Sequence, residues 1–180
     1  MSEATRYIVV FRGVGGKTQL PVARLRAVLE ADGFHGVKTY INSGNAVLTS
    51  TLDEAALARR VAELVRAKMG FDKSVLVRSL AEWDAMIAQN PFPEAVDEPT
   101  KLHVFTLEQE PEAERVEALR EKATGTDRFA VRGRALYLHT PDGMGNSRFA
   151  PKIETTLKVP MTARNWRTML ALRDLAAAIA

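Results

Sequence analysis

Cysteine is absent from the 180 residues of the chain, which excludes a disulfide framework, a thiol nucleophile and a thiolate metal site. Long apolar runs are also absent, and none approaches the roughly 18 to 20 residues that a membrane-spanning helix needs. What remains is typical of a globular protein, since 46% of the residues are hydrophobic and 26% are charged. A chain of this length can bury a normal core as one domain or as two small, closely packed halves.

Two further absences concern targeting and catalysis. The first residues, MSEATRY, lack the charged and apolar regions of a signal peptide, so we expect a cytoplasmic protein without membrane association. His35, His103 and His139 show no metal-ligand spacing, and we expect no metal site and no cofactor. No G-x-S-x-G elbow accompanies Ser43, so nucleophilic catalysis has no support.

A glycine-rich stretch, FRGVGGKT at residues 11–18, invites comparison with phosphate-binding loops. The pattern G-x-x-x-x-G-K-[ST] requires a first glycine where the sequence has Phe11, and the dinucleotide pattern G-x-G-x-x-G requires a third where it has Thr18. Both named motifs are therefore excluded. The loop stays a candidate anion site through its glycines and cations, namely Arg12, Gly13, Gly15, Gly16 and Lys17. The alternative is that the glycines only form a tight connection from a strand to a helix.

Charge is distributed unevenly along the chain, although the formal net charge is only +3. Residues 91–127 contain ten acidic and four basic residues, whereas residues 128–180 contain three acidic and nine basic residues. Two solvated faces of opposite sign would explain this distribution. A basic surface that attracts an anionic partner is the other interpretation.

The first half of the chain has the pattern of a ferredoxin-like unit. Hydrophobic periodicity and turn residues predict strands at 7–12, 37–41, 46–49 and 73–78. Helices are predicted after Pro21 and after a capping box of Thr51 with Glu54, and Ser79 with Glu82 caps a third helix. The resulting order, β-α-β-β-α-β, is typical of two helices on one face of an antiparallel sheet.

The second half partly repeats the order of strands and helices predicted for the first. The segment at 91–100 carries three prolines and is predicted to be a linker between subdomains at 1–90 and 101–180. A strand at 102–107, a helix, a hairpin and helices at about 149–158 and 163–178 give the order β-α-β-β-α-α. We therefore predict an α+β fold of two ferredoxin-like or related subdomains, with antiparallel sheets and helices packed on one face.

Two further segments carry candidate ligand-binding residues. The turn between the second and third strands contains Asn42, Ser43 and Asn45, although ordinary hairpin chemistry also explains these residues. This turn and the glycine loop can lie at opposite ends of a sheet, so a shared pocket is not predicted. Near the end of the chain, Thr162 is a plausible N-cap and Trp166 begins an apolar stripe that predicts a buried indole. The cations around this segment form the densest basic cluster, and with the neighbouring amide the candidate ligands are Arg148, Lys152, Arg164 and Asn165.

Three stretches together, FRGVGG at 11–16, TYINSGNAVL at 39–48 and TARNWRTML at 162–170, have a recognisable order and spacing. In this respect the chain resembles the bacterial domain-of-unknown-function family 1697. The resemblance implies a two-part α+β fold and no established activity. The family pattern is similar to R-G-I-N-V-G-G, whereas here the loop is two residues shorter and lacks the asparagine.

The sequence favours a binding protein for a phosphate-bearing ligand, either a nucleotide or a nucleic acid. One alternative is a small enzyme that acts on a phosphorylated metabolite, where the same cations would stabilise charge in the transition state. The other alternative is a protein-interaction module without a ligand. Whether the chain is an enzyme stays open at this point.

Overall fold

The computed structural model describes residues 2–14, 19–41 and 44–180, and the chain divides into two compact units. The first unit comprises residues 1–85 and 170–180, and the second comprises residues 86–169. Each unit has its own four-stranded sheet, in which every strand pair described is antiparallel. The α+β class and the two-subdomain arrangement predicted from the sequence are confirmed.

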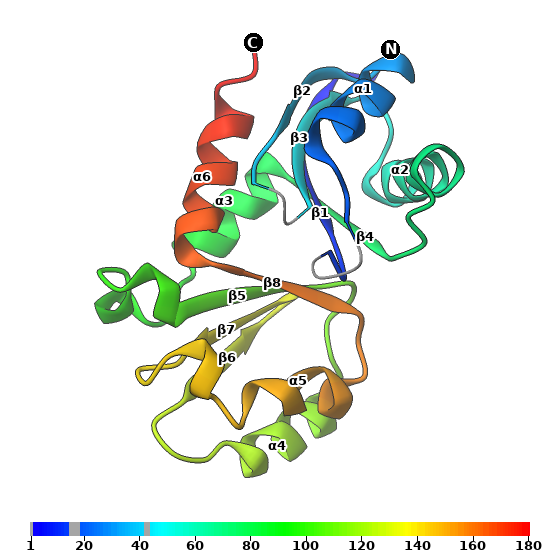
Figure 1. Cartoon of the computed structure of the whole chain (residues 1–180). Helices are drawn as coiled ribbons and strands as arrows, with labels where there is room; N and C mark the ends of the chain where they lie inside the picture. Colours follow the sequence, from blue (N-terminus) through cyan, green and yellow to red (C-terminus); the bar gives the residue numbers. More distant parts are fainter. Residues whose placement is uncertain (1, 15–18, 42–43) are drawn as a thin grey trace. The chain divides into compact units, whose positions relative to one another are not determined.

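The first unit has the predicted β-α-β-β-α-β order, and its sheet runs β2-β3-β1-β4. Figure 1 shows α1 and α2 on one face of this sheet. The elements are β1 (Thr5–Phe11), α1 (Val22–Ala31), β2 (His35–Thr39), β3 (Asn45–Ser50), α2 (Glu54–Met69), β4 (Val75–Ser79) and α3 (Leu80–Ala88).

One hydrophobic core fills the space between the first sheet and its two helices. Tyr7, Val9 and Phe11 of β1 are buried in it, because alternate residues of a strand share a face. The helices contribute apolar residues at helical spacing, as the sequence predicted, among them Leu57 and Val61 of α2. Burial of each such side chain contributes about 1.5–3 kcal/mol to the stability of the unit.

The start of α2 differs from the prediction. Asp53, and not Thr51, is the N-cap, and its carboxylate accepts a hydrogen bond of 2.7 Å from the amide of Ala56. Aspartate is as good an N-cap as serine or threonine, and its charge also interacts favourably with the helix dipole. At α3 the prediction is confirmed, because the amide of Glu82 donates to the hydroxyl of Ser79 at 3.2 Å.

The second unit repeats the same order of elements, and its sheet runs β6-β7-β5-β8. In Figure 1, α4 and α5 lie side by side on one face of this sheet. The elements are β5 (Leu102–Leu107), α4 (Ala113–Lys122), β6 (Arg128–Arg132), β7 (Ala135–His139), α5 (Ala150–Leu157), β8 (Met161–Asn165) and α6 (Trp166–Ala177), with short 3-10 helices at Pro93–Ala95, Pro99–Lys101 and Met144–Asn146.

Strand β8 corrects the partial repeat that the sequence predicted. Residues 161–165 pair with β5 along their whole length, so the second unit is a complete β-α-β-β-α-β repeat followed by a helix. Helix α6 therefore begins after β8, and Thr162 is not its cap. The side-chain oxygen of Asn165 takes that role by accepting a hydrogen bond of 3.0 Å from the amide of Thr168.

The domain boundaries also differ from the predicted ones. Residues 91–100 are not a separate linker, because they form two 3-10 turns of the second unit and bury Phe92 and Ala95. The second unit begins at residue 86, inside α3. Residues 170–180, in the later part of α6, cluster with the first unit instead of the second.

The repeat extends to the register of individual residues. Arg78 lies opposite Ile8 in the first sheet, and Arg164 lies opposite Val104 in the second. In both cases the arginine Nη1 donates to the carbonyl of the preceding residue at 2.9 Å.

In the part of the chain that the structure describes, no helix is long and apolar enough to cross a membrane.

Candidate functional site

The two loops that the sequence singled out in the first unit lie at the same end of its sheet. The amide of Phe11, the last residue of β1, donates to the carbonyl of Gly44 at 2.9 Å, and Val10 pairs with Asn45. A Cβ on Gly44 would lie only 2.7 Å from a methyl carbon of Val14. The chain after β1 and the turn before β3 are therefore packed against each other, which the sequence did not predict.

A lysine from a third segment joins this end of the sheet. The amide of Arg12 donates to the carbonyl of Ser74 at 3.0 Å, which holds the start of the loop against the residues before β4. The stem of Lys73 lies beside Gly13, with its Cδ 3.5 Å from the position of a Cβ there. Arg12 is half-buried and Lys73 is exposed, so basic residues from two different segments adjoin the same short stretch of backbone.

The backbone at this end is unusual at three positions. Gly13 and Gly44 both have φ of +75°, which glycine adopts without strain. Ile41 also has a positive φ, of +46°, although it is β-branched, and its side chain is 51% exposed. A β-branched residue in this region of φ is a strained outlier, and such strain is concentrated at functional sites.

Asn45 has a structural role in this arrangement. It is fully buried, and its side-chain nitrogen donates to the carbonyl of Tyr40 at 3.1 Å. This bond spans the turn between β2 and β3, as the alternative of ordinary hairpin chemistry anticipated. Five other predicted site residues lie outside the described residues, namely Gly15, Gly16, Lys17, Asn42 and Ser43.

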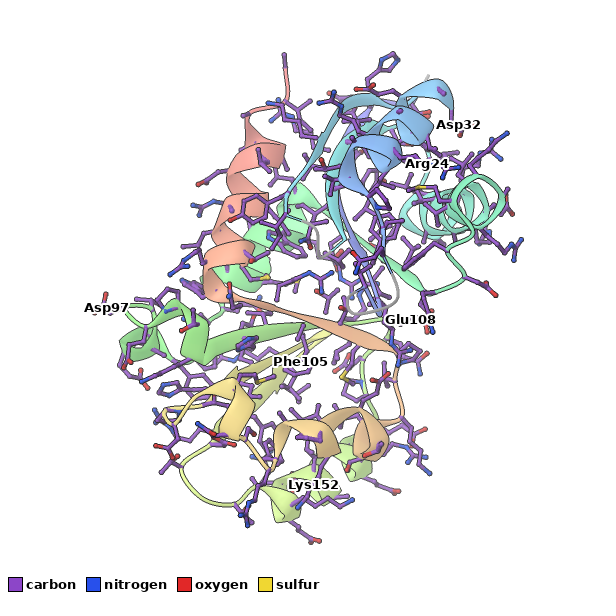
Figure 2. The ribbon with its side chains drawn as sticks, in the orientation of Figure 1. Arg24, Asp32, Asp97, Phe105, Glu108 and Lys152 are labelled. Carbon is purple, nitrogen blue, oxygen red and sulfur yellow. The ribbon has the colours of Figure 1, made fainter. Side chains whose placement is uncertain are left out.

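The predicted basic cluster of the second unit is not brought together. Arg148 lies just before α5 and Lys152, labelled in Figure 2, lies in its first turn; both are exposed. Helix α5 packs over the core around Phe105. Arg164 lies on β8 opposite Val104, and therefore on the other face of the sheet from Phe105. Arg164 therefore lies on the face of the sheet opposite α5, which carries Lys152.

Arg164 and Asn165 are explained in part by local structure. Burial lowers the pKa of Arg164 to about 10, so the guanidinium keeps its charge at neutral pH. It donates to the hydroxyl of Thr162 at 2.7 Å and to the carbonyl of Ala163. Asn165 caps α6, so neither residue needs a ligand to account for its position.

The second unit provides an internal reference for the candidate site. Leu107 ends β5 as Phe11 ends β1, and its amide donates to the carbonyl of Arg134 in the β6–β7 turn at 3.0 Å. The next amide, that of Glu108, donates to the carbonyl of Pro160 at 2.9 Å, in the same way that Arg12 bonds Ser74. Glu108, labelled in Figure 2, therefore occupies the place that Arg12 has in the first unit.

The two loops of the first unit are also longer than their counterparts. The connection from β1 to α1 covers residues 12–21, whereas that from β5 to α4 covers residues 108–112. The turn from β2 to β3 covers residues 40–44, whereas that from β6 to β7 covers only residues 133–134. The second unit connects the same order of elements with the shorter loops. The added residues of the first unit are therefore not required to connect its elements.

Sequence reasoning missed Lys73 and Ile41 as members of this site. Lys73 is distant from Arg12 along the chain, and only the pairing of β1 with β4 brings their segments together. The signal for Lys73 was a cation at the start of a predicted strand. In the described parts of the chain, no group of three or more histidine or carboxylate side chains could hold a metal ion.

Comparisons with known proteins agree with this fold. The model of a family described as "Protein of unknown function (DUF1697)" matches residues 4–137, which include Arg12 and Lys73. Among solved structures, the chain is similar to the conserved bacterial protein SP0830 from Streptococcus pneumoniae, with 23% sequence identity and a TM-score of 0.75. That likeness covers 97% of this chain and 99% of the other, and at this identity it shows the fold alone. No curated protein matches the chain.

Proposed function

Because the chain belongs to the DUF1697 family of proteins of unknown function, we propose its function from the site itself: the loop end of the first sheet binds a phosphate-bearing ligand. The ligand class is a nucleotide or a nucleic acid, bound in the cytoplasm of a bacterial cell. Arg12 and Lys73 would provide the positive charge, and the glycine positions would let the ligand approach the backbone closely.

The observation that carries this proposal is the difference between the two repeats. The position after the first strand holds Arg12 in one unit and Glu108 in the other, with the same backbone hydrogen bond. The same backbone position therefore carries a positive charge in one unit and a negative charge in the other. The presence of the arginine, together with the longer loops beside it, supports a role in binding an anion.

Arginine and lysine would contribute differently to such a ligand. The planar guanidinium of Arg12 can donate two parallel hydrogen bonds to one phosphate, which fixes the orientation of the ligand. The ammonium of Lys73 is a compact point charge on a flexible stem, and it can follow a phosphate that moves. We therefore expect Arg12 to contribute most of the specificity, with Lys73 adding mainly to the affinity.

The experiment is a titration of the protein with inorganic phosphate, with ATP and with a fluorescently labelled single-stranded oligonucleotide at low salt. Hydrogen bonds to a charged group contribute about 1.5–3 kcal/mol, so Arg12→Gln should weaken binding by about tenfold or more. Lys73→Gln removes one charge from an exposed side chain and tests the same site without risk to the fold. Arg59→Gln removes one exposed charge from α2 and serves as the control.

The dependence on salt separates the two ligand classes. A nucleic acid releases counterions at each neutralised phosphate, which gives a slope of about −0.7 per contact for a single strand in a plot of log affinity against log salt. A nucleotide should give a shallow slope and saturable, stoichiometric binding. Equal losses in all three variants would indicate general electrostatics and would reject this site. Turnover of ATP that depends on Arg12 would favour the enzyme alternative instead.

A further inference from the structure

A groove with a volume of about 530 Å³ lies between α1 and α2 of the first unit, away from the loops of the proposed function. Its size is within the range of about 300–1,000 Å³ that is usual for small-molecule sites. Figure 2 labels Arg24, in the first turn of α1, and Asp32, the residue that follows the last residue of this helix. The groove runs from one to the other, and eight residues of helix correspond to a length of about 12 Å.

The floor of the groove is apolar. It is made by Ala27, Val28 and Ala31 from α1 and by Leu64 from α2. The two alanines are exposed, and their small side chains leave the hollow between the helices unfilled. Larger apolar residues at these positions would cover the floor. With alanine there, the floor stays open and offers an apolar molecule a surface from which it can displace water.

The two ends of the groove differ in charge. At one end, Arg24 donates from Nη2 to the carbonyl of Lys68, and both of these cations line the groove. Among the described residues, no carboxylate pairs with either of them. Arginine carries five donors, so Arg24 keeps others for a ligand after this single bond. This end therefore has a surplus of positive charge and of unused donors.

The opposite end carries an ion pair with no net charge. Asp32 forms an ion pair with Arg60, in which the arginine Nε donates to the carboxylate at 2.8 Å. The hydrogen bond from Arg60 holds the pKa of Asp32 below its ordinary value, so the pair stays ionised at neutral pH. The same two residues also line a second hollow of about 480 Å³. Because this pair has no net charge, it attracts an anionic group less than the two cations at the Arg24 end, where the anionic group is therefore expected.

We infer that this groove binds a small amphipathic monocarboxylate, with the carboxylate at Arg24 and Lys68 and the apolar body along Ala27, Ala31 and Leu64. The charge at one end, the apolar floor and the neutral far end match the order of groups in such a molecule. The inference does not rest on the proposed function, because Arg12 and Lys73 do not line this groove.

The test is fluorescence titration with 8-anilinonaphthalene-1-sulfonate, an apolar ring system with one anionic group, followed by displacement with decanoate. Decanoate should displace the dye, whereas decanol lacks the charge and succinate lacks the apolar body, so both should be at least tenfold less effective. Arg24→Gln should weaken the binding of decanoate by about tenfold, because it removes the donor that faces the carboxylate.

Filling the groove provides the second variant. Ala27→Leu should abolish displaceable dye binding, whereas Ala55→Leu, at an exposed position of α2 outside the groove, should change the affinity less than twofold. Arg12→Gln should have no effect on this binding. Equal dye binding in the Ala27→Leu variant, or equal displacement by decanol and decanoate, would overturn the inference. Failure of decanoate together with Arg24-dependent binding of an acidic amphipathic peptide would also overturn it, in favour of protein docking.

Discussion

Gly44→Ala should destabilise the first unit, because it places a methyl group where the two loops of the candidate site meet. The new Cβ would lie 2.7 Å from a methyl carbon of Val14 and 2.9 Å from the Cβ of Phe11. The Cβ of Phe11 is fixed to the backbone of a central strand, so it cannot move aside as the end of a flexible side chain would. The loop after β1 must shift instead.

The magnitude has two parts. A residue with a Cβ in the left-handed region costs about 1–2 kcal/mol, and overpacking of a well-filled contact costs about 1–3 kcal/mol more. Gly44→Ala should therefore lower the free energy of unfolding by about 2–5 kcal/mol. Gly70→Ala is the matched control, because Gly70 has a similar φ of +65° and no atom lies within 4 Å of the place that its Cβ would take. It should cost only the first part, about 1–2 kcal/mol.

The assay is urea unfolding, monitored by far-ultraviolet circular dichroism. The free energy of unfolding of each variant is compared with that of the unmodified protein, with the same slope m used for all three. A cost for Gly44→Ala that exceeds the cost for Gly70→Ala by about 1–3 kcal/mol would support the contact between the loops. Equal costs would mean that the loop after β1 does not pack against the β2–β3 turn. The reasoning for a single site at this end of the sheet would then be refuted.

Three further predictions concern other parts of the units. Gly36→Ala would bring its Cβ to 2.5 Å from a methyl carbon of Ile179, so it should destabilise the protein, and Ile179→Ala in the same chain should recover part of the loss in a double-mutant cycle. Burial lowers the pKa of His103 to about 4, below the ordinary 6.5, so the unfolded chain binds more protons between these values. Stability should therefore be complete near pH 7 and fall by up to about 3 kcal/mol as the pH drops from about 6.5 through 4; an NMR titration that places this pKa above 6 would contradict the prediction. Asp53→Ala should cost about 0.5–2 kcal/mol in thermal unfolding as an N-cap, and Thr51→Ala should cost clearly less.

Much of the fold could be predicted from the sequence because its signals are local. The strand at 102–107 has the predicted bounds, and the apolar spacing of α2 gives its buried face. Trp166 is buried, as its place on an apolar stripe predicted. Strand β8 was missed because Thr162 and Asn165 have the spacing of a helix cap, whereas pairing with β5, which is remote in sequence, decides the structure of this segment.

The candidate site depended more on non-local information. The glycine positions could be identified from the sequence, but the contact between Gly44 and Val14 follows from the register of β1 and β3. The position of Arg164 relative to Lys152 also depends on the pairing of strands. Alternation along β8 directs Arg164 to the face of the sheet opposite α5, and a count of charges along the chain cannot include that alternation.

The most direct test of the proposed function is the affinity for ATP and for a single-stranded oligonucleotide, measured by titration at low salt in the unmodified protein and in Arg12→Gln. The change of Glu108→Gln, at the equivalent position of the second unit, is the internal control. The account predicts saturable binding of at least one of these ligands, weakened about tenfold or more by Arg12→Gln and unchanged or slightly strengthened by Glu108→Gln. No binding of either ligand, or equal weakening by both substitutions, would contradict it.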